Sequence, residues 1–138
     1  MAIRVLFFDA DGCLHPDPPR AGLHRLCWLP TLAELSKPHA DLRLVLHSSW
    51  RLAMPADFLA HLFSPLGHRF LGATSGPLRY PSITAWIAAS DEPVVSYRIV
   101  DDMPSEFPTP APTELIVCPG RQGITNHAVR SQISDWLG

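Results

Sequence analysis

Short apolar runs alternate along this chain with segments whose apolar residues recur at helical spacing. The runs have the length of buried strands, and polar residues or prolines bound them. Strands are expected at residues 3–8, 42–47, 69–71, 95–100 and 115–118, and helices at residues 26–35, 55–64, 82–89 and 126–137. Strands that alternate with helices predict an α/β fold, with a parallel sheet covered on both faces.

Two helices carry more detailed expectations. In the helix at residues 55–64, the apolar side chains expected to face the core are those of Phe58, Leu59, Leu62 and Phe63. Asn126 is expected to cap the final helix, because asparagine accepts hydrogen bonds from the first free N–H groups of a helix.

Fifteen prolines punctuate the chain without dividing it into domains. Four of them lie in residues 104–112, which should form a surface loop. Residues 14–42 have room for about one helix. A length of 138 residues is typical of one domain, so a single domain spanning residues 1–138 is expected.

Polar residues follow three of the predicted strands. Asp9-Ala10-Asp11-Gly12 ends the first, Ser48-Ser49 follows the second, and Asp101-Asp102 ends the fourth. In open α/β sheets, ligands collect at the carboxyl ends of the strands. These side chains are therefore expected to converge on one site.

Asp9 and Asp11 lie two positions apart, so on an extended segment their carboxylates would face opposite sides. The chain must turn at Ala10 for both to reach one site, and Gly12 permits such a turn. Two nearby carboxylates need a cation or a proton between them, and their hard oxygen atoms suit Mg²⁺. The alternative for these four residues alone is an Asx-type turn that only ends the strand.

The tract Phe-Phe-Asp-Ala-Asp-Gly-Cys-Leu at residues 7–14 resembles the first motif of the haloacid dehalogenase (HAD) superfamily, whose members are mostly Mg²⁺-dependent phosphatases. Ser48 resembles its second motif, and Asp101-Asp102 resembles its fourth. Residues 11–16 and 46–51 are similar to a narrower group of small HAD domains. That group is associated with RNA-repair proteins and resembles the phosphatase half of polynucleotide kinase-phosphatases.

The superfamily resemblance spans residues 3 to about 118 and implies a three-layer, Rossmann-like (HAD-like) fold. Its central, mostly parallel sheet would have about five strands. Many HAD enzymes carry a cap domain, but residues 14–42 leave no room for one. The site is therefore expected to be open to solvent, which suits a macromolecular or bulky phosphate ester.

The resemblance also implies residue roles. Asp9 would be the nucleophile and a metal ligand, and Asp11 the general acid and base, with its main-chain carbonyl on Mg²⁺. Asp102 is favoured as the third metal ligand, while Asp101 would orient a metal-bound water or a neighbouring donor, or merely cap a turn; the choice between the two acids stays open. Ser48 would hydrogen-bond the phosphoryl group, with Ser49 as the alternative if the register differs by one.

The third motif departs from the usual pattern, which has lysine there. Lys37, the only lysine, precedes the second strand and lies on the wrong side of the second motif. Arg79 is the best-placed cation, because it stands just before Pro81 and the helix expected there, and the resemblance to small HAD domains implies arginine at this place. Arginine can fork two phosphate oxygens, so it can replace lysine chemically. The alternative for Arg79 is a solvated surface charge. Arg51 and Gly12 are expected to contact substrate, although Arg51 could instead pair with a carboxylate.

The aromatic residues nearby are open to two interpretations each. Trp50 could pack near the site or belong to the core, and His15 could reach substrate or pack the loop. The other six histidines lack metal-ligand spacing and are expected at the surface or partly buried.

Composition narrows the remaining possibilities. The net charge of −2 gives no global attraction to nucleic acid or anionic lipid, so a polyanionic substrate would need a local basic site. Three cysteines without metal-site spacing are expected to be free thiols. No signal peptide or membrane span is visible, which favours a cytoplasmic location, and no obligate protein partner is evident.

The sequence thus predicts a Mg²⁺-dependent phosphomonoester hydrolase that acts through an aspartyl-phosphate. Its substrate would be a phosphorylated small molecule, such as a nucleotide, or a nucleic-acid end. The alternatives are a HAD-like domain used for binding or scaffolding, and a phosphotransferase or phosphonatase that shares the aspartyl-phosphate step. Retention of Asp9, Asp11 and Ser48 together with both acids after the fourth strand argues against a scaffold.

Overall fold

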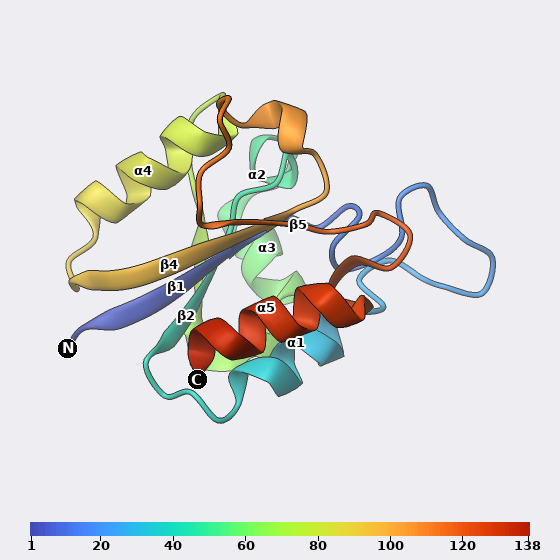
Figure 1. Ribbon diagram of the computed structural model, residues 1–138, viewed down its shortest axis with the longest axis horizontal. Coiled ribbons are helices and arrows are strands. Elements are labelled where there is room, and N and C mark those ends of the chain that lie inside the picture. Colours follow the sequence, from blue (N-terminus) through green and yellow to red (C-terminus); the bar gives the residue numbers. More distant parts are fainter.

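The computed structural model describes residues 1–138, with a five-stranded sheet between two layers of helices (Figure 1). The strands are β1 (Ile3–Phe8), β2 (Leu42–Leu46), β3 (Phe70–Ala73), β4 (Val94–Asp101) and β5 (Leu115–Val117). Their order is β3-β2-β1-β4-β5, and every neighbouring pair is parallel. The predicted three-layer α/β fold is confirmed.

β1 is the central strand and is buried on both faces. Leu6 and Phe8 point into the core on one side of the sheet, while Val5 and Phe7 point into the core on the other. Parallel strands covered on both faces need such continuous apolar sequences. Arg4 interrupts the run near the start of β1, where its guanidinium pairs with Asp41 at 2.7 Å.

The α-helices are α1 (Leu29–Ser36), α2 (Trp50–Ala53), α3 (Ala56–Leu62), α4 (Arg79–Ala89) and α5 (His127–Leu137). One face of the sheet is covered by α1, α3 and α5, through core residues that include Leu32, Leu59 and Ile133. The other face is covered by α4, through Ile83 and Trp86. Figure 1 shows this separation, with α4 on one side of the strands and α1 and α5 on the other.

The final helix begins as the sequence predicts. Oδ1 of Asn126 accepts a hydrogen bond from the N–H of Val129 at 3.1 Å. Such a cap stabilises a helix by about 1 kcal/mol. The expectation for Asn126 is therefore confirmed.

Three local expectations need correction. Phe58 is 43% exposed and does not face the core, because α3 is short and only Leu59 of the helix is fully buried. α4 begins at Arg79, since Pro81 falls in its first turn, where N–H groups have no intrahelical partner. The short helix α2, which follows β2 directly, was not predicted.

The connections after β1 and β4 are largely irregular. Residues 16–28 form a loop without regular structure, which extends beyond the carboxyl ends of the strands at the right of Figure 1. Between β1 and β2 the only α-helix is α1. The proline-rich tract at 104–112 is a loop with one 3₁₀ turn, Pro104–Glu106, and it buries Phe107 against the core beneath α4.

No helix of the structure combines the length and the apolar character needed to cross a membrane.

Candidate active site

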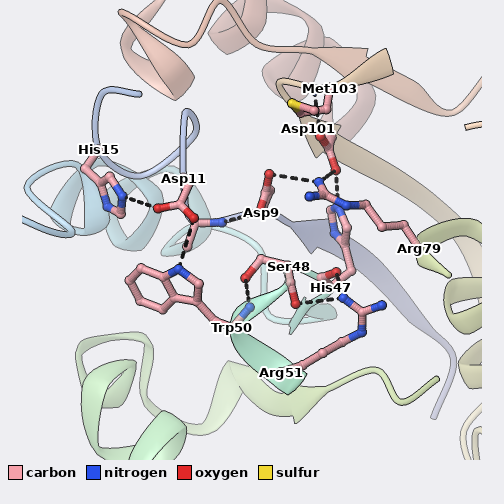
Figure 2. Close-up of polar contacts among 11 residues, drawn as sticks. Asp9, Asp11, His15, His47, Ser48, Trp50, Arg51, Arg79, Asp101 and Met103 are labelled. Atoms are coloured by element: carbon pink, nitrogen blue, oxygen red, sulfur yellow. Dashed lines mark hydrogen bonds and ion pairs between the residues drawn. The ribbon is translucent and has the colours of Figure 1, made fainter. Parts of the chain in front are cut away.

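The carboxyl ends of β1, β2 and β4 bring polar side chains to one edge of the sheet (Figure 2). Asp9 follows β1, Ser48 follows β2 after one residue, and Asp101 ends β4. β1 pairs in parallel with both β2 and β4, so the three strand ends must meet with Asp9 in the middle. Residues far apart in the sequence are thereby assembled around one carboxylate.

The chain turns sharply after β1, as the Asp-Ala-Asp-Gly sequence predicts. The N–H groups of Cys13 and Leu14 both donate to the carbonyl of Ala10, at 3.2 and 2.9 Å. Gly12 adopts a φ of 77°, in the left-handed region. A Cβ atom at Gly12 would also collide with the carboxylate of Asp102, so glycine serves both the turn and the close approach of the two loops.

Three carboxylates form the centre of the site. Oxygens of Asp9, Asp101 and Asp102 lie within 4.8 Å of one another. Asp9 and Asp101 are buried, at 2% and 0% exposure, whereas Asp102 is half-buried. The carboxylate of Asp11 is not part of this cluster.

Arg79, the first residue of α4, reaches into the cluster. Its Nη1 donates to Oδ2 of Asp9 at 3.1 Å and to Oδ2 of Asp101 at 2.6 Å. Only 15% of its side chain is exposed, so Arg79 is a partly buried cation bound to two acids and not a solvated surface charge.

The electrostatics of the cluster leave an excess of negative charge. Burial raises the pKa of Asp9 to about 8, with a further contribution from the neighbouring Asp101 that Arg79 only partly offsets. Burial also raises the pKa of Asp102. For Asp101, burial would raise the pKa, but hydrogen bonds from His47 and the charge of Arg79 outweigh it and lower that pKa. A proton or a cation is needed to balance this site.

The donor set fits a hard divalent cation. Asp9 and Asp102 offer carboxylate oxygens, and the main-chain carbonyl of Asp11 accepts no hydrogen bond from the protein. By contrast, both carboxylate oxygens of Asp101 are already used, Oδ2 by His47 and Arg79 and Oδ1 by the N–H of Met103 at 2.7 Å. Of the two adjacent acids, Asp102 is therefore freer to bind a metal.

The Asp11 side chain lies on the opposite side of Asp9 from Arg79 (Figure 2). Its Oδ1 contacts Nε2 of His15 at 2.7 Å, and its Oδ2 accepts from Nε1 of Trp50 at 3.1 Å. The N–H of Leu26 donates to Nδ1 of His15, which leaves Nε2 to donate to Asp11. The carboxylate is still 44% exposed and so stays accessible.

The residues after β2 differ in how they face the site. Ser48 is fully buried, and its Oγ accepts a hydrogen bond from the N–H of Trp50 at 3.1 Å, which leaves its own hydroxyl proton free to donate. Ser49 is exposed. Arg51 donates to the carbonyls of His47 and Ser48, both at 2.8 Å, and to that of Gly76 at 2.9 Å, so it braces this loop.

One protein-family model, described as the HAD domain in Swiss Army Knife RNA repair proteins, matches residues 5–129. The chain belongs to this family. Searches of curated proteins and of solved structures find no match. Membership confirms the HAD-like fold and the RNA-repair resemblance that the motifs indicated, and it supports a hydrolase of the HAD type.

Within this HAD domain, the two candidate cations of the third motif differ in exposure and in their contacts with the acidic cluster. Lys37 is 71% exposed by its side chain and pairs with Glu34 at 2.9 Å, outside the acidic cluster. Arg79 contacts two of the three acids directly. The geometry is thus consistent with the prediction for Arg79.

The part played by His47 was not predicted. It was expected at the surface or partly buried, and that expectation is wrong: the side chain is fully buried. Its position, directly before Ser48 at the end of an apolar strand, was the one available signal. Trp50 belongs to the core and also packs near the site, because its ring joins the core cluster while its N–H donates to Asp11.

Proposed function

We propose that this domain is a Mg²⁺-dependent phosphomonoester hydrolase in which Asp9 is the nucleophile. One observation carries the proposal: a buried carboxylate at the end of the central strand lies within reach of two further acids and of one arginine. An ion pair that only stabilises the fold needs one acid and one cation, whereas this site has three clustered acids around one arginine. Phosphoryl transfer requires a nucleophile, a metal site and a cation for the phosphoryl oxygens.

Asp9 would attack phosphorus through a carboxylate oxygen. The bond from phosphorus to the ester oxygen breaks, and the leaving oxygen takes the bonding electron pair together with a proton from Asp11. A water molecule then loses a proton to Asp11 and attacks the aspartyl-phosphate at phosphorus, which restores Asp9 and releases phosphate. Two displacements thereby replace one difficult hydrolysis.

Arg79 would neutralise Asp9 before the attack and hold a phosphoryl oxygen afterwards. Its Nη1 lies 3.1 Å from Oδ2 of Asp9 and its position is fixed by Asp101. A preorganised donor in a buried site acts at the point where charge develops in the transition state.

Mg²⁺ would be held by Asp9, Asp102 and the main-chain carbonyl of Asp11, with Asp101 positioning Arg79. When bound, it would neutralise charge on the nucleophile and on the phosphoryl oxygens. The raised pKa of Asp9 supports this assignment, since a group that is costly to ionise alone is favoured as an anion beside a divalent cation.

Ser48 would donate its hydroxyl proton to a phosphoryl oxygen. Ser49, which is exposed, and the main chain at Gly12 would line the rim of the site. Arg51 would contribute positive charge while it keeps the Ser48 loop in place.

We further propose that residues 1–138 act as one unit on the phosphate of a nucleotide or of a nucleic-acid end. The family is described by its occurrence in RNA repair proteins, and only the helix α1 and the loop at 16–28 separate β1 from β2. An open site of this kind admits a long substrate.

The test is a panel of phosphate esters that includes 3′-phosphorylated and 5′-phosphorylated oligonucleotides, with Mg²⁺ and with EDTA. The proposal expects Mg²⁺-dependent release of phosphate and faster turnover of an oligonucleotide end than of small metabolite esters. Tight binding of oligonucleotides without any turnover would instead identify a binding or scaffolding domain.

A further inference from the structure

Two loops beside the candidate active site carry positive charge that the proposed chemistry does not use. The first is the loop at residues 16–28, and the second follows β5 at residues 119–123. Together they contain Arg20, Arg25 and Arg121 against a single acid, Asp17. These loops therefore carry two net positive charges in a chain whose net charge is −2.

Most arginines of the chain are engaged by its own structure. Seven of the ten form ion pairs or donate to main-chain oxygens, namely Arg4, Arg20, Arg43, Arg51, Arg69, Arg79 and Arg98. The three loop arginines are exposed and form no ion pair with any acid, and Arg20 donates only to the carbonyl of Arg121 in the neighbouring loop, at 3.3 Å. They are available to bind an external anion.

The two loops meet next to the acidic cluster. The N–H of Asp17 donates to the carbonyl of Gly120 at 2.9 Å, and Nη1 of Arg20 donates to the carbonyl of Arg121 at 3.3 Å. A Cβ atom placed on Gly120 would lie 3.6 Å from Oδ2 of Asp102. Arg121, the next residue, is thus anchored directly beside the candidate metal site.

A cleft of about 470 Å³ opens at this junction, and its lining is free of large apolar side chains. The residues that line it are Pro18, Pro19, Arg20, Arg121 and Gln122. Arginine and glutamine donate hydrogen bonds to phosphate and sugar oxygens, and prolines keep such a surface rigid. The chemistry of the cleft suits a phosphate-rich ligand.

Arg25 adds a third cation, close to the residue that holds Asp11. Its guanidinium lies 5.0 Å from the ring centroid of Trp50, the residue whose indole N–H holds Asp11. A guanidinium that stacks on an aromatic ring has a fixed orientation, in which it can bind a phosphate or stack on a base.

We propose that these two loops bind the sugar–phosphate backbone of a single-stranded polynucleotide whose terminal phosphate lies at Asp9. The proposal rests on the proposed function and specifies its substrate. A small ester would end at the site and leave the cleft empty, whereas a strand places successive phosphates along it. Asp9 is only 2% exposed, so the flexible end of a single strand can reach it more readily than a rigid duplex.

The experiment measures binding of a fluorescein-labelled, 3′-phosphorylated RNA oligonucleotide by anisotropy, with Mg²⁺ present and the full chain carrying Asp9→Asn to prevent turnover. In this background, Arg20→Ala with Arg121→Ala should raise Kd about tenfold, because two backbone contacts are lost. The slope of the logarithm of the observed binding constant against the logarithm of salt concentration should become shallower by about 1.4. Each lost phosphate contact of a single strand accounts for roughly 0.7 of this change.

The matched control removes two positive charges elsewhere. Lys37 is exposed and Arg43 lies near the start of β2, at the opposite end of the strands from the site. Lys37→Ala with Arg43→Ala should leave Kd and the salt slope unchanged. The same comparison with a DNA oligonucleotide shows whether the 2′-hydroxyl contributes to recognition.

Equal Kd values for the Arg20–Arg121 double variant and the control would overturn the proposal. So would a phosphoserine peptide that binds as tightly as the oligonucleotide and is weakened to the same extent by the same substitutions. Failure of the proposed function is recognised separately: the chain with Asp9 intact would release no phosphate from any ester, while the binding difference between the two double variants would persist.

Discussion

Nε2 of His47 donates a hydrogen bond to Oδ2 of Asp101 at 2.7 Å, and both side chains are fully buried. Burial lowers the pKa of His47, so the ring is neutral and its one proton lies on Nε2. The same carboxylate oxygen accepts from Arg79, which in turn reaches Asp9. His47 therefore positions Arg79 through Asp101, without contacting Asp9.

Substitution of His47 tests this linkage. His47→Phe keeps an aromatic ring but removes a donor from a buried carboxylate, and it should cost about 1–3 kcal/mol in the free energy of unfolding. It should also lower kcat more than it changes KM, because Arg79 loses its fixed position. Urea unfolding and steady-state kinetics measure the two effects.

A rescue and a double-mutant cycle separate positioning from general destabilisation. His47→Gln can keep a donor near the place of Nε2 and should recover part of kcat. In an Arg79→Ala background, His47→Phe should have little further effect on kcat. Additive losses of kcat would show that His47 does not act through Arg79.

Arg79 itself should have a large effect on catalysis. Arg79→Ala removes the cation that contacts both Asp9 and Asp101 and should lower kcat by about 10²–10³-fold. Arg79→Lys should recover part of the loss, since the charge remains but the planar fork does not. Lys37→Ala should retain wild-type kcat, and an inactive Lys37→Ala beside an active Arg79→Ala would mean that the third motif is misplaced.

Much of this site could be predicted from the sequence because its chemistry lies at strand ends. Asp9, Ser48 and Asp101 each follow an apolar run, and parallel strands bring such positions to one edge. Arg79 could be predicted from its place just before Pro81 and the helix that follows, together with the family resemblance.

The contacts of buried polar groups could not be predicted in the same way. His47 and Asp101 are 54 residues apart, and their pairing depends on the positions of β2 and β4 on either side of β1. The indole N–H of Trp50 finds Asp11 only because α2 starts directly after β2. Phe58 lies at the sequence spacing expected of a core residue. That spacing identifies one face of a helix, but it does not show how much of the face other elements cover.

The pKa of Asp9 predicts how stability responds to pH and Mg²⁺. Its folded-state pKa of about 8 exceeds its ordinary value of 3.8, so the folded state holds a proton that the unfolded state has lost. Stability of the metal-free protein should therefore fall as pH rises toward 8, by about 1–2 kcal/mol between pH 6.5 and 8. Mg²⁺ should reverse this fall, because it stabilises the ionised carboxylate.

Urea unfolding in EDTA and in Mg²⁺ at these two pH values checks the prediction. Asp9→Asn cannot titrate and should abolish the pH-dependent difference between the two conditions. A Mg²⁺ effect that is equal at both pH values and survives in Asp9→Asn would exclude Asp9 as a metal ligand.

Asp11 should matter most for poor leaving groups. Asp11→Asn removes the proton donor, and an activated aryl phosphate needs that proton less than an alkyl or nucleoside phosphate does. The expected result is a steeper dependence of kcat/KM on the leaving-group pKa in the variant. A parallel loss for all esters would assign Asp11 a purely structural part, consistent with its contacts to His15 and Trp50.

The proposed function depends above all on a covalent bond between Asp9 and phosphorus. The most direct measurement quenches the enzyme with acid during turnover of a phosphate ester in Mg²⁺ and determines by mass spectrometry which peptide carries a phosphoryl group. One hydroxylamine-labile phosphoryl group is expected on the peptide that contains Asp9, and neither that group nor phosphate release is expected in Asp9→Asn. Turnover by Asp9→Asn at the wild-type rate, or a phosphoryl group on another residue, would contradict it.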